Sequence, residues 1–403
     1  MKSQNNNIIP TLLGGDLNAY SVAAAFYLHG GFKSEVFARQ KLGAVSNSNF
    51  INLHTVKNLD ECDFAVPSLV SFSRKNEGKS LILVPCADWY MEMLEYARDI
   101  LSGHYYFNIP TFEVWRCVSD KHSFLSLLSK FGIKTPETAV ISCPEEIGRA
   151  TEEIGGDFVL KPSDSTQYWK NPFPYMKKVY FPRKAEHVRL VSEMIFKSGY
   201  RGKILLQKRI WGEGRREPRA SVLTTYSNRR GKVIRAVLGD VLIEERGATS
   251  VGNYSAIVTR PLSPMCYELI ELLDSLSYTG VANFDILEGA EGSFCLEANP
   301  RQGRSSDYLR GAGVNLAELL LADMRGEELP KVFVYPEILW SAIPPSVAIA
   351  MAKDSSLKRR ADRIYKEKGY FSPYRIPEDN RLLRKLYVFL HQARQVKRLE
   401  GRL

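Results

Sequence analysis

The sequence lacks an apolar run long enough to cross a membrane. A spanning helix needs ~20 nearly uninterrupted apolar residues, whereas the best stretch, residues 338–352, is shorter and contains Pro344 and Pro345. The amino terminus also lacks a basic segment followed by an apolar run, because residues 5–7 are asparagines and Asp16 interrupts the apolar residues behind them. We therefore expect no transmembrane helix, no secretory signal and a cytoplasmic location.

Paired cysteines are also lacking. The six cysteines are scattered, and none stands in a C-x-x-C pair or near a histidine at metal-ligand spacing. We interpret them as reduced core residues of a cytosolic protein.

Excess charge is almost absent outside the carboxyl-terminal segment. The net charge is +10, of which residues 353–403 contribute +9 through 15 Lys and Arg against 6 Asp and Glu. A nucleic-acid-binding surface spread over the molecule would need a wider basic excess, so no nucleic-acid partner is expected. A carboxyl-terminal site for an anionic substrate, partner or membrane surface stays open.

What is present is the composition of a globular protein, with 403 residues, 44% of them apolar and 25% charged. This length suggests two or three domains or subdomains. Near the amino terminus, short apolar runs alternate with helical patterns at residues 8–13, 19–29, 35–38, 81–86 and 89–101. Such βα alternation predicts an α/β region with a parallel sheet, whose strand ends open into ligand-binding loops.

The middle of the chain mixes helices with antiparallel strands, which is typical of the α+β class. Ser119 is the expected N-cap of a helix that ends at Gly132. The aperiodic residues 163–182 are expected to form a long loop, which in enzymes is often a lid. Strands are expected at residues 138–141, 158–161, 204–207, 220–226, 232–243, 281–287 and 294–298, and helices from Pro144, at 185–198 and at 264–277.

Asp285, Glu297 and Asn299 are expected to share one face of a strand pair. Opposed residues on adjacent antiparallel strands lie within ~5 Å of one another, and residues two apart on one strand project from the same face. Mg²⁺ that bridges nucleotide phosphates is held by one or two carboxylates together with substrate oxygens. We therefore predict a metal site here, although an acidic pair on a hairpin is more often merely solvated.

The residues around this site resemble the ATP-grasp ligases. The resemblance is carried by residues 278–285 (YTGVANFD), 294–301 (FCLEANPR) and 158–165 (FVLKPSDS). It implies an ATP-grasp fold behind an amino-terminal Rossmann-like domain, with ATP and Mg²⁺, or Mn²⁺ in its place, as cofactors. The residues implied are Asp285, Glu297 and Asn299 for the metal, and Lys121, Lys161, Ser163 and Ser165 for the phosphates.

The resemblance extends to the adenosine part of the nucleotide. Residues 205–213 (LLQKRIWGE) look like the hinge strand whose backbone contacts adenine and whose following acid holds the ribose. The implied binding residues are Gln207, Lys208, Ile210 and Glu213. The family often has an acid at the position of Gln207, and its usual spacing to the ribose acid falls on Gly214.

Over most of its length the sequence is similar to one branch, the D-aspartate ligases of peptidoglycan precursor side-chain synthesis. The similarity is carried by residues 9–18 (IPTLLGGDLN), 86–90 (CADWY), 250–254 (SVGNY) and, most specifically, 299–306 (NPRQGRSS). It implies that an acidic amino acid, D-aspartate in that branch, is joined to the lysine side-chain amine of a UDP-linked muramyl pentapeptide or a similar acceptor.

The chemistry of such a ligase gives roles to the arginines. A carboxylate acylates poorly, so it is first converted into an acyl phosphate with ATP, mainly through positioning and charge neutralisation. Arginine forks suit planar carboxylates and phosphates, so Arg301 and Arg304 are catalytic candidates together with Lys161. Weaker substrate-binding candidates are Asp16, Asn18, Asp88, Arg219, Ser305 and Ser306. Asp16, Asn18 and Asp88 are equally well explained as helix N-caps.

Residues 380–399 are expected to form a basic amphipathic helix. Its apolar residues at helical spacing are Leu382, Leu383, Leu386, Leu390, Ala393, Val396 and Leu399. Such a helix docks on the enzyme, rests on an anionic membrane, or attracts an anionic precursor. We favour docking of the apolar stripe on the core.

The sequence thus predicts three regions: a Rossmann-like domain at 1–118, an ATP-grasp catalytic region at 119–330 and a basic helical extension at 331–403. A ligase for another amino acid or peptide acceptor is the main alternative. A non-catalytic nucleotide- or nucleic-acid-binding protein is the more distant one. The oligomeric state stays open.

Overall fold

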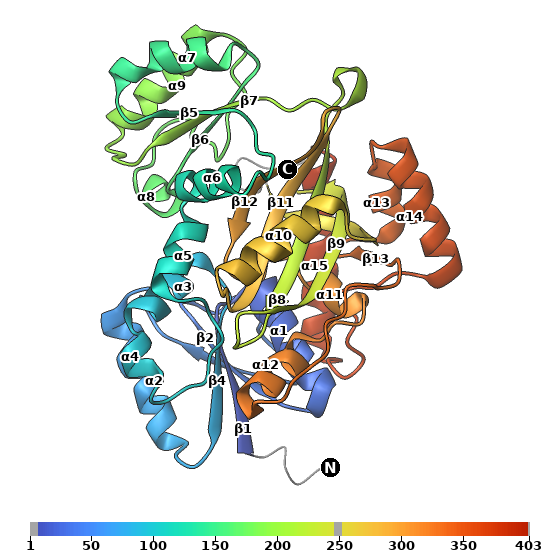
Figure 1. Ribbon diagram of the computed structural model, residues 1–403. Coiled ribbons are helices and arrows are strands. Elements are labelled where there is room, and N and C mark those ends of the chain that lie inside the picture. The colour runs from blue at the N-terminus through green and yellow to red at the C-terminus, as the bar shows by residue number, and fades with distance from the viewer. Residues whose placement is uncertain (1–6, 246–251, 402–403) are drawn as a thin grey trace.

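A computed structural model of the chain describes residues 7–245 and 252–401, apart from the side chains of Ser165 and Thr166. These residues form three β-sheets with helices packed against them (Figure 1). The predicted phosphate-binding side chain of Ser165 and part of the motif at 250–254 therefore lie outside the described residues.

The amino-terminal sheet is parallel, as predicted. Its strands are β1 (Ile8–Leu13), β2 (Ser34–Ala38), β3 (Ile51–Thr55) and β4 (Ser80–Pro85), in the order β3-β2-β1-β4. Helix α1 (Leu17–Gly30) packs on one face, and α2 (Cys62–Lys75), α3 (Asp88–Tyr96) and α4 (Arg98–Leu101) pack on the other. The sequence patterns did not predict β3, which carries polar side chains, or α2, which has Pro67 in its interior.

A small antiparallel sheet forms the upper subdomain of Figure 1. Its strands, in the order β5-β7-β6, are β5 (Thr138–Ile141), β6 (Phe158–Pro162) and β7 (Ile204–Lys208). One face packs on α7 (Ile147–Ile154), which follows the 3-10 turn Pro144–Glu146, and on α9 (Ala185–Lys197). Leu160 belongs to that core, so the next residue, Lys161, projects from the opposite face.

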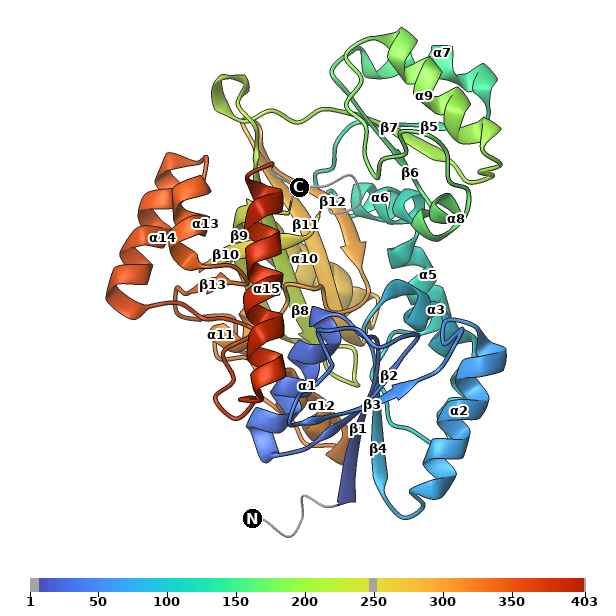
Figure 2. The same ribbon diagram turned by 180° about the vertical axis from the view of Figure 1, so that it is seen from behind.

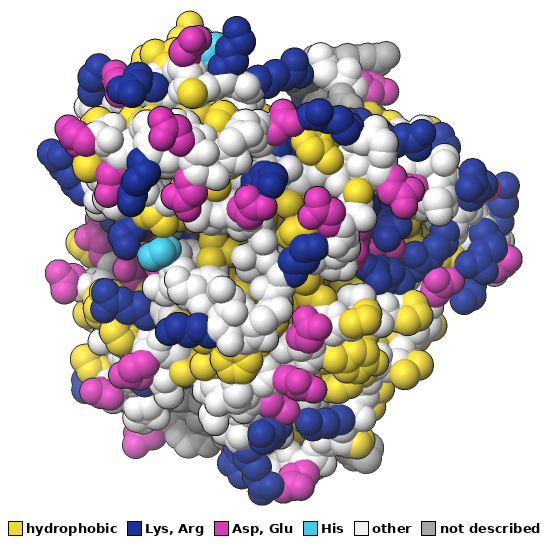
Figure 3. Space-filling model, turned by 45° about the horizontal axis from the view of Figure 1, so that its top comes forward, with side chains coloured by type: hydrophobic (Ala, Val, Ile, Leu, Met, Phe, Trp, Pro, Cys, Tyr) yellow, Lys and Arg dark blue, Asp and Glu magenta, His cyan; other side chains and the backbone are white. Residues whose placement is uncertain are grey.

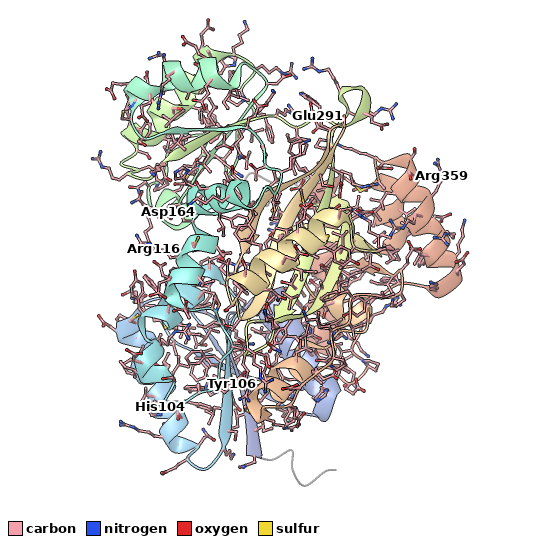
Figure 4. The ribbon with its side chains drawn as sticks, viewed as in Figure 1. His104, Tyr106, Arg116, Asp164, Glu291 and Arg359 are labelled. Carbon is pink, nitrogen blue, oxygen red and sulfur yellow. The ribbon has the colours of Figure 1, made fainter. Side chains whose placement is uncertain are left out.

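Two predictions for this subdomain were wrong in detail. Ser119 is the last residue of α5 (Phe112–Ser119), and Asp120 caps α6 (Lys121–Lys130) instead by accepting a hydrogen bond from the Ser123 amide at 2.8 Å. The expected loop at 163–182 contains the short helix α8 (Ser165–Lys170), which Asp164 caps. Asp164 lies beside α8 in Figure 4 and is near enough to Glu92 of α3 to contribute to a raised pKa there, behind burial as the main cause.

The large sheet is antiparallel and has the order β12-β11-β8-β9-β10-β13. Its strands are β8 (Arg219–Ser227), β9 (Val233–Glu244), β10 (Tyr254–Arg260), β11 (Gly280–Gly289), β12 (Gly292–Asn299) and β13 (Leu339–Ser341), and the turn Glu213–Arg215 precedes them. Both predicted strand pairs, β8–β9 and β11–β12, are confirmed. Strand β11 starts with Gly280 at φ +86°, where an added Cβ would lie 2.4 Å from the Asn108 carbonyl oxygen. Only glycine fits this close approach to the amino-terminal region.

Helices cover both faces of the large sheet (Figures 1 and 2). Helix α10 (Pro264–Ser275) buries Leu223, Leu238 and Phe284 on one face. On the other face, α1 and α12 (Leu316–Arg325) share a core with Val222 and Val237, and the short helix α11 (Tyr308–Gly311) joins them. The amino-terminal helix α1 therefore packs directly against the large sheet.

The carboxyl-terminal region is largely helical. It contains α13 (Pro345–Met351), α14 (Ser355–Lys368) and α15 (Leu382–Leu399), and β13 within it joins the large sheet through β10. Lys and Arg side chains gather at the right of Figure 3, over α13 and α14. No helix that the structure describes combines the length and the apolar character that a bilayer-spanning segment needs.

Candidate active site

The β11–β12 pair brings the three predicted metal ligands to one face. Asp285 and Glu297 are opposed in the strand register, and Asn299, two residues beyond Glu297, is opposed to Asn283. The Tyr254 hydroxyl donates a hydrogen bond to Asp285 Oδ1 at 2.8 Å and fixes its carboxylate.

The two carboxylates of this face differ in electrostatics. Burial and the neighbouring charge of Glu297 raise the pKa of Asp285 to about 7. Burial would also raise the pKa of Glu297, but Lys121, Lys161 and Lys178 hold it below its usual range. A cation between the two carboxylates would relieve the repulsion that Asp285 experiences.

This set of donors fits a divalent ion that is shared with a substrate. Two carboxylates and an amide suit Mg²⁺ or Mn²⁺ when phosphate oxygens complete the coordination shell. Within residues 7–245 and 252–401 there is no cluster of three or more His, Cys, Asp or Glu that would hold a metal by protein ligands alone. The donors present fit a metal ion whose coordination shell a nucleotide completes.

Three lysines surround Glu297. Lys121 Nζ lies 3.4 Å from Glu297 Oε2, and Lys161 is buried with a pKa that burial lowers to about 8 although Glu297 opposes the shift. The sequence reasoning missed the third, Lys178. It belongs to the segment after α8, and its Nζ would lie 3.1 Å from a Cβ added to Gly252, just before β10. No local pattern distinguishes Lys178 from Lys177 beside it.

The predicted phosphate loop is fixed by Tyr200. The Ser163 amide donates to the Lys203 carbonyl at 2.9 Å, and the Ser163 hydroxyl lies 3.5 Å from the Tyr200 hydroxyl. The Tyr200 hydroxyl also accepts a hydrogen bond from the Asp164 amide at 3.1 Å. This end of the loop is thus anchored, and the Ser163 side chain is buried.

The predicted hinge, residues 205–213, begins in β7 and then lies against the β11–β12 turn. Gln207 is buried and donates to the Thr138 hydroxyl at 2.8 Å, whereas Lys208 pairs with Glu137 at 2.8 Å near the surface. Among the hydrogen bonds of the described residues, none is donated by the Ile210 amide. Glu213 is exposed at the start of the following turn. The contact of this backbone with adenine stays a prediction.

Arg301 follows β12 and points at the amino-terminal sheet. It forms a two-pronged ion pair with Asp88, with Nε to Oδ1 and Nη2 to Oδ2 both at 2.7 Å. Asp16 and Asp285 are also near enough to act on the pKa of Arg301, which burial opposes and Asp88 raises above its ordinary value. Asp88 itself is the first residue of α3 and makes no capping hydrogen bond.

Arg304 is connected with the carboxyl-terminal helix α15 through Glu245. The sequence did not predict this connection. Its Nη1 lies 3.0 Å from Glu245 Oε2, and Gln395 of α15 donates to Glu245 Oε1 at 3.3 Å. Burial and nearby arginines, Arg304 first among them, lower the pKa of His391 to about 4, so its imidazole is neutral near pH 7. These contacts join residues far apart in the chain, and no local pattern would have found them.

Three of the weaker candidates make hydrogen bonds within the protein. Asp16 caps α1, accepting from the amides of Asn18 and Ala19, which supports its interpretation as an N-cap. Asn18 donates to the carbonyls of Cys86 and Gln302 at 3.0 Å each and thereby ties α1, β4 and the segment after β12. Ser305 and Ser306 are buried, and the Ser306 hydroxyl accepts from the Gly303 amide at 2.7 Å.

Arg219 does not join this constellation. It is in register with Glu288, three residues beyond Asp285, so it projects from the opposite face of the sheet. There it lies 3.5 Å from the buried Asp240, which also pairs with Arg260 and Arg360. The sequence identified the strand, but the strand register turns this side chain away from the metal ligands.

Comparisons with known proteins bear on the fold. A D-aspartate ligase of Enterococcus faecium (strain Aus0004) is 26% identical over 391 residues, which are 91% of this chain and 90% of that protein. The biotin carboxylase domain of 2-oxoglutarate carboxylase from Hydrogenobacter thermophilus, solved with MgADP and bicarbonate, superposes with a TM-score of 0.60 and 17% identity, over 79% of this chain and 70% of that one. The chain has the ATP-grasp fold.

A second solved structure supports the same fold. N5-carboxyaminoimidazole ribonucleotide synthetase from Thermus thermophilus gives a TM-score of 0.59 at 17% identity and covers 82% of each chain. No protein-family model matches the chain. The resemblance to ATP-grasp carboxylate–amine ligases, and to D-aspartate ligases within them, is confirmed. Its relatives and neighbours are enzymes that use ATP to form C–N bonds, as the sequence predicted.

Proposed function

We propose that this protein is an ATP-dependent ligase that activates an acidic amino acid, D-aspartate, as an acyl phosphate. It then joins that amino acid to the lysine side-chain amine of a cytoplasmic peptidoglycan precursor, a UDP-linked muramyl pentapeptide or a close analogue. The similarity to a D-aspartate ligase along nearly the whole chain supports the choice of donor and acceptor.

The nucleotide would lie between the small and large sheets, within residues 119–330. The Ile210 amide would contact adenine, and Lys121, Lys161 and Lys178 would neutralise the phosphates. Asp285, Glu297 and Asn299 would hold Mg²⁺, which supplies further charge neutralisation when bound. The half-buried setting strengthens each of these interactions relative to water.

The donor would lie where the carboxyl ends of β1 and β4 meet the segment after β12, at the border of residues 1–118. The guanidinium fork of Arg301, which pairs with both carboxylate oxygens of Asp88, supports its choice as a partner for a donor carboxylate. Arg301 and Arg304 would orient the donor carboxylate and then stabilise the oxyanion that forms when the acceptor amine attacks.

One observation carries the proposal above the others. The predicted metal ligands lie within electrostatic reach of both sets of cations: Lys121, Lys161 and Lys178 lower the pKa of Glu297, and Arg301 acts to lower that of Asp285. Phosphoryl transfer to a carboxylate needs these groups side by side.

Phosphate release from ATP and Mg²⁺ tests the proposal. A panel of D- and L-amino acids is supplied with and without UDP-linked muramyl pentapeptide, with Glu297→Ala as the inactive control. Release that needs both D-aspartate and the pentapeptide, and that the substitution abolishes, is the expected result.

Other outcomes redirect the assignment. Release with a different amino acid or a short peptide acceptor would keep the ligase mechanism and replace the substrates. No turnover with any amino acid, together with salt-sensitive RNA or DNA binding, would contradict the enzyme assignment in favour of a binding protein.

A further inference from the structure

Helix α15 docks on the protein through its polar and aromatic side. Arg384 is buried, forms an ion pair with Asp379 at 3.2 Å, donates to the Ala44 carbonyl at 2.6 Å and stacks on the Tyr20 ring at 3.9 Å. Farther along the helix, Gln392 donates to the Ala342 carbonyl at 2.9 Å. The helix docks on the core, as predicted, but of the leucines in the predicted stripe only Leu399 is buried there.

The other leucines of the stripe face outward, together with Phe389. Leu382, Leu383, Leu386, Phe389 and Leu390 are 82%, 63%, 53%, 69% and 44% exposed. At 100° per residue these side chains lie on the side of the helix opposite Arg384 and Gln395. Figure 2 shows α15 at the surface, in front of the large sheet, with no other element over it. Five large apolar side chains thus form one continuous exposed patch, which we call the outer face.

Cations border the outer face. Helix α15 contains Lys385, Arg394, Lys397 and Arg398 on its exposed surface and no Asp or Glu, and Arg381 precedes it. Within the described part of the chain, none of these five cations forms an ion pair. A second copy docked by the same face would bring two such cationic borders together, and their repulsion disfavours that arrangement.

We propose that the outer face of α15 binds an anionic lipid bilayer. The helix would lie in the plane of the interface, with Leu386, Phe389 and Leu390 below the headgroups and Lys385, Arg394 and Lys397 against the anionic phosphates. An apolar face between basic side chains is the pattern of interfacial helices, and each cation near an anionic surface adds attraction that salt screens.

The position of α15 connects the outer face with Arg304, one of the predicted catalytic residues. Gln395, on the inner side of the same helix, is hydrogen-bonded to Glu245, the partner of Arg304. Glu245 and Arg304 would therefore lie about one helix diameter, roughly 10–12 Å, from the lipid surface. The inference does not depend on the proposed function, because it rests on the outer face alone.

Sedimentation with vesicles tests the inference. The full-length protein is mixed at low salt with vesicles of phosphatidylcholine alone, or with one third phosphatidylglycerol. We expect binding to the anionic vesicles, weakening at high salt, and little binding to the neutral ones. The double variant Leu386→Glu/Phe389→Glu should lower the bound fraction about tenfold or more, since it places two carboxylates in the apolar patch.

Matched controls separate surface chemistry from damage to the fold. Val334, 88% exposed on another segment, takes the same change as Val334→Glu and should leave vesicle binding intact. Lys385→Gln/Lys397→Gln should weaken binding to anionic vesicles several-fold, whereas Lys75→Gln/Lys79→Gln, on and just after α2, should not. If Leu386→Glu/Phe389→Glu fails to fold, the comparison of the two double Lys→Gln variants decides the test.

Two results would overturn the inference. One is failure of the wild-type protein to sediment with anionic vesicles at low salt. The other is a concentration-dependent dimer that Leu386→Glu/Phe389→Glu dissociates while vesicle binding is absent, which would assign the outer face to a second copy. If the wild-type protein binds anionic vesicles but shows no ligase turnover, only the proposed function is contradicted.

Discussion

The β11–β12 pair and helix α15 carry equally clear sequence patterns, and the structure treats the two patterns differently. In the strand pair, alternation placed Asp285, Glu297 and Asn299 on one face, and the register confirms it. In α15, the 3.6-residue period identified a helix but indicated the wrong buried face, because all its leucines except Leu399 point outward. A pattern therefore determines which side chains share a face more reliably than it determines what covers that face.

The difference follows from the distance between partners along the chain. The two strands of the pair are adjacent in sequence and close through a two-residue turn, so their register is decided locally. The partners of α15 are Asp379 nearby but also Tyr20, Ala44, Ala342 and Glu245, which only the complete fold brings together.

The largest expected effect tests the strand pair. Glu297→Gln removes a charge that pairs with Lys121 and would hold the metal, so turnover should fall by roughly 10²- to 10³-fold or more. The control is Glu291→Gln in the exposed turn of the same pair, at the top of Figure 4, which should keep full turnover. Phosphate release measures both, and equal activities would remove Glu297 from the site.

The next effect tests the inner side of α15. Arg384→Met leaves the buried carboxylate of Asp379 without its cation, which should lower the free energy of unfolding by about 3–5 kcal/mol. Lys385→Met, one residue later and exposed, should change it by less than about 0.5 kcal/mol. Urea denaturation compares the two, and similar losses would contradict docking through Arg384.

A variant of Lys178 tests whether the phosphate-binding site includes a lysine that no local sequence pattern identified. Lys178→Ala should lower turnover by roughly 10- to 100-fold through lost charge neutralisation at the phosphates. Its neighbour Lys177 supplies the control, Lys177→Ala, with turnover near wild type. Identical behaviour of the two variants would contradict a phosphate role for Lys178.

Lys161 predicts a pH dependence. Burial lowers its pKa from the ordinary 10.5 to about 8, so the ammonium is lost as the pH rises through that value. Above pH 8, kcat/KM for ATP should fall by up to about tenfold per pH unit. In Lys161→Arg the guanidinium stays charged, and the decline should move to higher pH. An unchanged pH profile would show that another group titrates.

The smallest effect tests the outer side of α15. Leu386→Gln changes an exposed side chain, so the free energy of unfolding should shift by less than about 0.5 kcal/mol. A stripe buried on the core would instead cost about 2–5 kcal/mol. Thermal melting distinguishes these values, and a large loss would restore the interpretation that the leucines face the core.

The three arginines predicted from the sequence do not share one place in the structure. Arg301 and Arg304 were selected from a motif of the segment after β12, and they pair with Asp88 and Glu245. Arg219 was selected because arginines suit carboxylates, yet its register with Glu288 turns it to the Asp240 side. An odd or even offset along a strand decides the face, and that offset depends on pairing that the sequence does not state.

By itself, the amino-acid sequence determined the features that rest on local periodicity and spacing: the βα alternation, the strand pair with its three oxygen-bearing side chains, and a basic helix at the carboxyl end. The tertiary structure alone decided that Lys178 lies near enough to Glu297 to lower its pKa, that Arg301 is paired with Asp88, and that α15 turns most of its leucines to solvent. The physical reason is that burial and charge pairing are properties of surfaces meeting across the fold, and a repeat within one segment does not record which surface it will meet.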